Sequence, residues 1–172
     1  GLKYKTFFTE ELPCFIQSVF PVTKKPKKTY IAGLSMGGYG AWYLALSRPD
    51  LYGKAASLSG AVDMNGIIEN AIRNDHLEGS YNWVRTFGDP MKFIGGESDL
   101  YRLYSELKKK EIRIPSLYQA CGTEDFLYEG NQKIRRFLTE NGADLTYEEG
   151  PGAHTWDFWE TYIQRVLDWL MK

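Results

Sequence analysis

The sequence predicts an α/β fold in which a mainly parallel sheet carries helices on both faces. Three observations lead to this prediction: short β-prone runs alternate with amphipathic stretches, glycine-containing turns separate them, and the alternation shows no internal repeat. Parallel strands need long crossovers, which are usually helices that pack back onto the sheet. With 172 residues, 43% of them hydrophobic, the chain has the length and composition of a single globular domain spanning residues 1–172.

Four runs have the composition of strands, and helices are expected before, between and after them. The expected strands are residues 29–33, 54–58, 116–121 and 145–149. The clearest helices are expected after Thr6, at residues 37–47, 98–110 and 131–141, and after Thr155. Because crossovers between parallel strands are right-handed, the strands should lie side by side in chain order.

The first and last helices each carry an apolar stripe that is expected to face the core. In the first helix, which Pro21 ends, the stripe comprises Leu12, Phe15, Ile16, Val19 and Phe20. In the last helix it comprises Trp156, Trp159, Ile163, Val166, Leu167 and Leu170. The alternative for Trp156 and Trp159, which lie near His154, is to line an acyl pocket. Ser98 is expected to cap the helix that runs to Lys110.

Residues from about 63 to 97 show no clear period, and we expect them to cross one end of the sheet as a lid or cap with only short helices. His76 lies in this stretch between acidic neighbours and is expected to be a surface or lid residue. The aromatic side chains of Tyr81, Trp83 and Phe87 are candidates for the inner side of such a lid.

The overall charge of −1 argues against nucleic acid or an anionic membrane as partner, and the one basic run, at residues 24–28, is expected to be a solvated loop. No run of 18 apolar residues is present. Cys14 and Cys121 are expected to be free, mostly buried thiols, which a reducing compartment allows, and we expect a cytoplasmic location. The start at Gly1, without a methionine or a signal-like segment, suggests a cut within a longer polypeptide.

The sequence Gly33-Leu34-Ser35-Met36-Gly37 has the pattern G-x-S-x-G at the point where a predicted strand gives way to a predicted helix. This is the setting of a nucleophile elbow, in which a sharp turn lifts the serine hydroxyl above the sheet. We expect the flanking glycines to avoid collisions in the turn, and Gly38 and Gly40 to let the helix approach the strand. The Met36 amide, at the positive end of the helix, is the expected oxyanion donor.

A serine nucleophile needs a base and an acid that orients the base. Of the two histidines, His154 follows the last strand and therefore lies on the same rim of the sheet as Ser35. Glu124 and Asp125 follow the third strand on that rim, and Asp63 follows the second. Position favours the loop at residues 121–125 without deciding between its two carboxylates.

Four blocks together resemble the esterase D / tributyrin esterase branch of the α/β-hydrolases, which is related to S-formylglutathione hydrolases and to acetyl xylan and feruloyl esterases. The blocks are residues 33–41 (GLSMGGYGA), 57–60 (SLSG), 120–125 (ACGTED) and 150–156 (GPGAHTW). The resemblance covers nearly the whole chain. It implies an α/β-hydrolase fold with Ser35 as nucleophile, Asp125 rather than Glu124 as acid and His154 as base.

The resemblance also implies a serine carboxylic-ester hydrolase that acts through an acyl-enzyme on small-molecule esters, with short acyl groups as the default and with neither metal nor organic cofactor. A peptidase or thioesterase with the same triad is the alternative, and a non-catalytic hydrolase-like fragment is another. Family members carry strands before the first helix that this sequence lacks. We therefore expect a missing N-terminal segment, or a second copy in a homo-oligomer, to pair with residues 29–33 and supply the second oxyanion amide.

Overall fold

A computed structural model describes residues 3–74 and 87–172 of the chain. Its centre is a four-stranded parallel sheet in the order β1-β2-β3-β4, which confirms the predicted fold class and strand order. The strands are β1 (Tyr30–Leu34), β2 (Lys54–Leu58), β3 (Ser116–Gly122) and β4 (Leu145–Gly150). Each lies within one residue of its predicted bounds.

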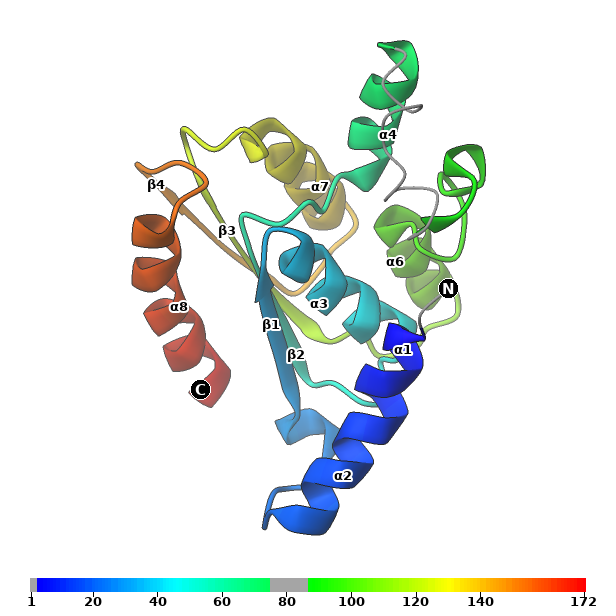
Figure 1. Ribbon diagram of the computed structural model, residues 1–172, viewed down its shortest axis with the longest axis vertical. Coiled ribbons are helices and arrows are strands. Elements are labelled where there is room, and N and C mark those ends of the chain that lie inside the picture. Colours follow the sequence, from blue (N-terminus) through cyan, green and yellow to red (C-terminus); the bar gives the residue numbers. More distant parts are fainter. Residues whose placement is uncertain (1–2, 75–86) are drawn as a thin grey trace.

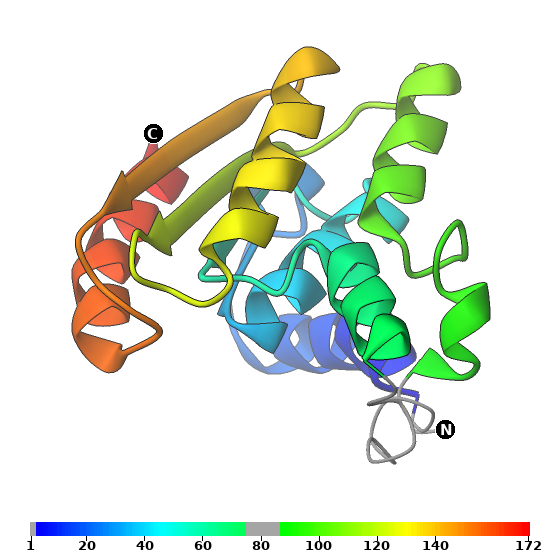
Figure 2. The ribbon, with the colours of Figure 1, turned by 90° about the horizontal axis from the view of Figure 1, so that it is seen from above.

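Helices cover both faces of the sheet (Figures 1 and 2). One face carries α8 (Trp156–Met171), and the other carries α3 (Met36–Ser47), α6 (Leu100–Lys109) and α7 (Tyr128–Glu140). Further helical segments in the described residues include α1 (Tyr4–Thr6), η1 (Phe7–Glu11), α2 (Leu12–Val19), η2 (Pro26–Lys28), α4 (Met64–Arg73) and η3 (Pro90–Lys92). The helix expected after Thr6 therefore begins earlier, at Tyr4.

The two central strands are buried on both sides. Ala55 and Leu117 face the cluster formed with α3, α6 and α7, whereas their neighbours Ala56 and Tyr118 face the cluster formed with α8. All four side chains are at most 1% exposed. Successive side chains of a strand point to opposite faces, so a strand covered on both faces contains an unbroken run of buried residues.

Some predicted helix faces are wrong. Phe15, Val19 and Phe20 of the first stripe are 59%, 56% and 52% exposed, so among the described residues nothing covers that side of α2. In α8, Trp159 and Val166 are buried as predicted, but Trp156 is 66% and Leu167 is 50% exposed. The helical period identified these stripes correctly as apolar, but it does not show whether another element covers them.

The predicted helix cap and the predicted place of Phe87 need correction as well. The residue that caps α6 is Asp99, not Ser98: the Asp99 carboxylate accepts hydrogen bonds from the amides of Tyr101 and Arg102. Phe87 packs against Tyr39 in the core instead of lining a lid. The predictions for His76, Tyr81 and Trp83 lie outside the described residues. Cys14 is exposed, contrary to prediction, and Cys121 is buried.

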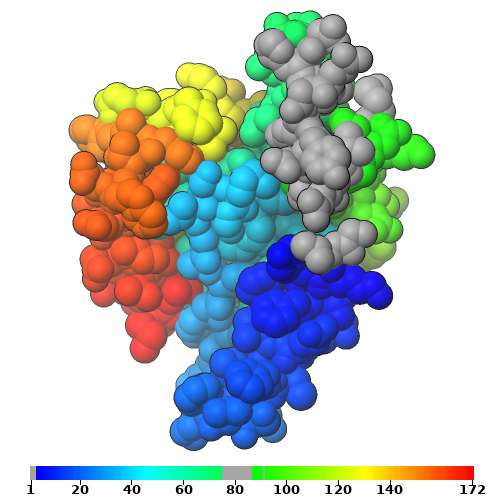
Figure 3. All heavy atoms as spheres, in the orientation of Figure 1, coloured from blue at the N-terminus to red at the C-terminus, as the bar shows by residue number. Residues whose placement is uncertain are grey.

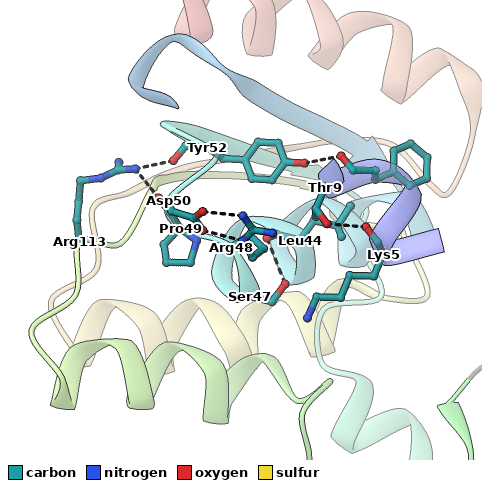
Figure 4. A network of polar contacts seen from close by, with 10 residues as sticks. Lys5, Thr9, Leu44, Ser47, Arg48, Pro49, Asp50, Tyr52 and Arg113 are labelled. Atoms are coloured by element: carbon teal, nitrogen blue, oxygen red, sulfur yellow. Dashed lines mark hydrogen bonds and ion pairs between the residues drawn. The ribbon is translucent and has the colours of Figure 1, made fainter. Parts of the chain in front are cut away.

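A polar network joins separate segments at the amino-terminal end of the sheet (Figure 4). Arg48 forms a bidentate ion pair with Asp50, at 2.9 and 2.7 Å. The Arg113 guanidinium donates to the carbonyls of Pro49 and Tyr52, and the Tyr52 hydroxyl donates to the carbonyl of Phe8 in η1. These contacts tie the first helical segment to the sheet at the end opposite the predicted catalytic rim.

Among the described residues, no helix is long and apolar enough to cross a membrane.

Candidate active site

Ser35 sits in the turn between β1 and α3 with φ 54° and ψ −124°. Positive φ is costly for a residue with a side chain, by about 1–3 kcal/mol, and persists only where neighbouring contacts hold it. Here the Ser35 amide donates to the Leu58 carbonyl at 2.9 Å, and the Ser35 carbonyl accepts from the Gly38 amide at 3.0 Å. The strand-to-helix turn thus has the geometry of a nucleophile elbow.

The glycines of this turn differ in what they do. A Cβ on Gly33 would lie 2.1 Å from the Gly37 carbonyl oxygen, and one on Gly38 would lie 2.5 Å from the Ser57 hydroxyl. These two positions exclude a side chain, as predicted. At Gly37 and Gly40 a Cβ would meet nothing within 4 Å, so the steric role predicted for these two glycines is wrong.

The structure brings Ser35, His154 and Asp125 together at the carboxyl ends of β1, β4 and β3. Nε2 of His154 lies 3.0 Å from Oγ of Ser35. Nδ1 of the same ring lies 2.8 Å from Oδ2 of Asp125. Both distances allow hydrogen bonds, so the three side chains form a continuous chain from hydroxyl to imidazole to carboxylate.

The carboxylate of Asp125 is buried and is held in place by a backbone hydrogen bond. Its side chain is 0% exposed, and Oδ1 accepts a hydrogen bond from the Leu127 amide at 2.8 Å. This leaves Oδ2 for the imidazole. A buried carboxylate in this arrangement fixes the ring orientation and favours its protonated form.

Glu124, the other carboxylate of this loop, points to a different partner. It is exposed and accepts hydrogen bonds from the Thr123 hydroxyl and from the Gly152 amide, the second of which lowers the pKa of its carboxyl. Glu124 therefore ties the loop after β3 to the loop that carries His154. The Glu124 amide reinforces the tie by donating to the Gly152 carbonyl at 3.1 Å.

Gly122 is part of the same tie, because a Cβ there would lie 2.0 Å from the Gly152 carbonyl oxygen. This contact between the two loops was not predictable from the sequence, because it depends on pairing between β3 and β4 that extends to Gly122 and Gly150.

Asp63, the third candidate acid, is a structural residue. It caps α4 by accepting from the Gly66 amide, and it also accepts from the Tyr101 hydroxyl at 2.9 Å. The Lys133 ammonium lies 3.3 Å from its other oxygen. Burial, followed by the nearby Asp63 charge, raises the pKa of the Tyr101 hydroxyl, which keeps it a donor.

Two aromatic rings flank the imidazole of His154. The Trp159 ring is 4.9 Å away, edge to face, and the Trp159 side chain is almost wholly buried. The Phe126 ring lies 4.6 Å away and is 77% exposed. Phe126 was not among the site residues predicted from the sequence, although its place directly after Asp125 could have indicated it.

Cys121, at the end of β3, is a poor alternative to Ser35 as nucleophile. Burial raises the pKa of the Cys121 thiol to about 12, so the thiol stays protonated at neutral pH and is a poor nucleophile. Within residues 3–74 and 87–172, no group of three or more His, Cys, Asp or Glu side chains is placed to hold a metal ion.

The chain matches the family model described as "Putative esterase" over residues 2–170. It is 40% identical to an acetyl esterase of Caldicellulosiruptor saccharolyticus over 96% of this chain and 63% of that protein. In solved structures it resembles an S-formylglutathione hydrolase of Staphylococcus aureus, with 29% identity and a TM-score of 0.78 over 94% of this chain and 61% of that one.

The fluorophosphonate-binding serine hydrolase F of Staphylococcus aureus is also similar, with 30% identity and a TM-score of 0.82, over 96% of this chain and 62% of that one. The chain thus spans about three-fifths of the length of these relatives. The nucleophile elbow, the parallel sheet and the family match lead to one conclusion: the chain belongs to the esterase family of the α/β-hydrolases, in its esterase D-like branch.

Proposed function

We propose that the protein is a serine carboxylic-ester hydrolase in which Ser35 is the nucleophile, His154 the base and Asp125 the orienting acid. The hydrogen-bonded chain from the Ser35 hydroxyl through His154 to the buried Asp125 carries this proposal. A serine hydroxyl is a poor nucleophile at neutral pH unless a base takes its proton as it attacks.

In the first step the Ser35 oxygen attacks the ester carbonyl while Nε2 of His154 takes the hydroxyl proton. The Met36 amide, at the first position of α3, donates to the developing oxyanion, and the helix N-terminus adds its partial positive charge. The tetrahedral intermediate collapses, His154 gives its proton to the leaving alkoxide, and an alcohol departs. The acyl group stays on Ser35.

In the second step His154 removes a proton from a water molecule, which attacks the acyl-enzyme and releases the carboxylic acid. Asp125 holds the ring and stabilises its charge in both steps. No metal or organic cofactor takes part in this scheme.

Short acyl groups are the substrates that we propose, because the relative with 40% identity is named an acetyl esterase. The similarity to an S-formylglutathione hydrolase favours an acyl thioester as the second candidate. Relative rates on p-nitrophenyl acetate and on an acyl thioester distinguish the two.

Replacing the nucleophile tests the proposal. In the whole protein, Ser35→Ala should lower kcat/KM for p-nitrophenyl acetate by about 10⁴-fold or more without loss of folding. Ser18→Ala is the control, since Ser18 is an exposed serine whose hydroxyl contacts only its own helix in the described residues. If Ser35→Ala kept about a tenth of the activity, the assignment would be wrong.

We also propose that a segment of the same polypeptide, outside residues 1–172, pairs with β1 and supplies the second oxyanion amide. Two facts support it: β1 pairs on one side only within the described residues, and the chain spans only 61–63% of its relatives. A second copy in that place would instead make the whole protein a dimer, so a monomer in sedimentation supports the proposal and a dimer that depends on β1 contradicts it.

We propose a small-molecule ester as the substrate. Cytoplasmic residence stays a prediction from the sequence, and fractionation of cells that produce the whole protein tests it.

A further inference from the structure

A cleft of about 470 Å³ opens beside the proposed triad. Its floor is the chain that follows β2, from Gly60 to Asp63. One wall is α4, with Ile67 and Asn70. The other is formed by Phe126 and Leu127 before α7 and by Glu129 and Gly130 in its first turn. The cleft therefore lies on the carboxyl rim of the sheet, where α/β proteins bind their ligands.

Phe126 connects this cleft to the catalytic ring, since it lines the cleft and its ring lies 4.6 Å from that of His154. On its other side His154 meets Trp159, which belongs to the core. The leaving oxygen of an ester must reach Nε2 of His154 to receive its proton. An alcohol attached to that oxygen finds an apolar hollow bordered by Trp159 on one side and the partly polar cleft lined by Phe126 on the other.

The charged groups of the cleft are both acidic. The described residues that line the cleft include Asp63 and Glu129 but no lysine or arginine. The Asp63 charge is compensated by Lys133 at 3.3 Å and by two hydrogen-bond donors. Glu129 is exposed at the cleft wall, so it sets the sign of the potential that an entering group meets.

We propose that this cleft binds the alcohol part of the ester, and that Glu129 makes it select neutral alcohols over anionic ones. The inference rests on the proposed hydrolase function and adds a substrate class to it. Phe126 offers an apolar face, and the Asn70 carboxamide offers hydrogen bonds, which together suit an uncharged, partly polar alcohol.

The test uses two esters with one acyl group, 4-acetoxybenzamide and 4-acetoxybenzoate, which release a neutral and an anionic phenol. We expect the whole protein to prefer the neutral ester. Glu129→Gln should raise kcat/KM for the anionic ester about 3- to 10-fold and change the neutral one by less than about 2-fold, because a unit charge within several ångströms in partly aqueous surroundings has that effect. Salt at about 0.5 M should shrink the preference of the wild type.

Glu140→Gln is the matched control, since Glu140 is an exposed glutamate at the far end of the same helix. It should change neither rate. An unchanged preference in Glu129→Gln, or an equal change in Glu140→Gln, would overturn the inference.

A binding measurement separates failure of this inference from failure of the hydrolase function. If neither ester is hydrolysed in a Ser35-dependent way, the proposed function fails. NMR titration of the Ser35→Ala variant with the two phenols then tests, independently of hydrolysis, whether the cleft binds them selectively. Binding of 4-hydroxybenzamide but not 4-hydroxybenzoate, with the difference lost in the additional Glu129→Gln variant, supports the inference. Equal binding of the two phenols, or binding of neither, contradicts it.

Discussion

The two outer strands of the sheet differ in how they meet their surroundings. On β4, Glu148 accepts from the Tyr118 hydroxyl and pairs with Arg165, while the Glu149 carboxylate accepts from the Tyr147 hydroxyl. On β1, residues 30–34 contain no charged side chain, and Ala32 is exposed. Figure 3 shows the face of the molecule on which β1 lies, between α8 and the first helical segments.

An apolar hollow of about 330 Å³ adjoins the β1 edge on its α8 side, and its lining includes Ala32, Leu34, Trp156 and Trp159. Edges that end a sheet usually carry charges, because an uncharged edge invites another strand. Parallel strands, moreover, are usually buried on both sides. β4 therefore has the features of a strand that ends a sheet, whereas β1 has those of a strand that is paired on both sides.

The largest effect is expected where β1 turns into α3. Gly33→Ala places a Cβ 2.1 Å from a backbone oxygen and must move the turn that holds Ser35. We expect a loss of about 3 kcal/mol or more in unfolding free energy, together with nearly all ester turnover.

Gly37→Ala is the matched control, because a Cβ there meets nothing within 4 Å. It should leave stability within about 1 kcal/mol of wild type. Urea unfolding and kcat/KM measure both variants. An active, stable Gly33→Ala protein would show that the turn is looser than the structure has it.

An intermediate effect compares the two edges directly. Ala32, Ala56, Tyr118 and Thr146 form one row across the sheet, so Ala32 and Thr146 occupy equivalent places on opposite edges. In the whole protein, Ala32→Asp should cost about 2 kcal/mol or more if a paired segment buries the new charge. Thr146→Asp should cost less than about 1 kcal/mol. Equal and small decreases in the unfolding free energy of the two variants, measured by chemical unfolding, would mean that the β1 edge faces water.

The smallest effect concerns pH at the β4 edge. Hydrogen bonds from Tyr147, then Tyr128, lower the pKa of the Glu149 carboxyl. A carboxyl whose pKa is lower in the folded state stabilises the protein above its ordinary pKa, and that contribution is lost as the pH falls through the folded value. The melting temperature should therefore fall less steeply in Glu149→Gln than in wild type between about pH 6 and about pH 3. If the melting temperatures of the two proteins fell in parallel over this pH range, the stabilising role of the Glu149 carboxylate would be contradicted.

Strand positions, strand order and the coverage of both faces were predictable, because each depends on local periodicity and on the handedness of crossovers. The elbow at Ser35 was predictable from five residues. Exposure of Phe15 and Trp156 was not, since it depends on whether another segment covers them.

For the candidate site, Ser35, Asp125 and His154 were named from motif and chain position, and the structure places them within hydrogen-bonding distance. The residues alone left Glu124 and Asp125 undecided, because neighbours in a loop differ only in the direction of their side chains. The resemblance favoured Asp125. The role of Glu124 in holding Gly152, and that of Phe126 beside the cleft, arise from contacts between loops distant in sequence.

Labelling of the whole protein with a fluorophosphonate probe tests the central claim most directly, because such a probe reacts quickly only with an activated serine. Intact-mass measurement and peptide mapping should find one probe per chain, on Ser35. His154→Ala should slow labelling by about 100-fold or more, since the base is lost while the serine remains. Rapid labelling of a different serine, or an unchanged labelling rate in His154→Ala, would contradict the assignment of Ser35 as a nucleophile activated by His154.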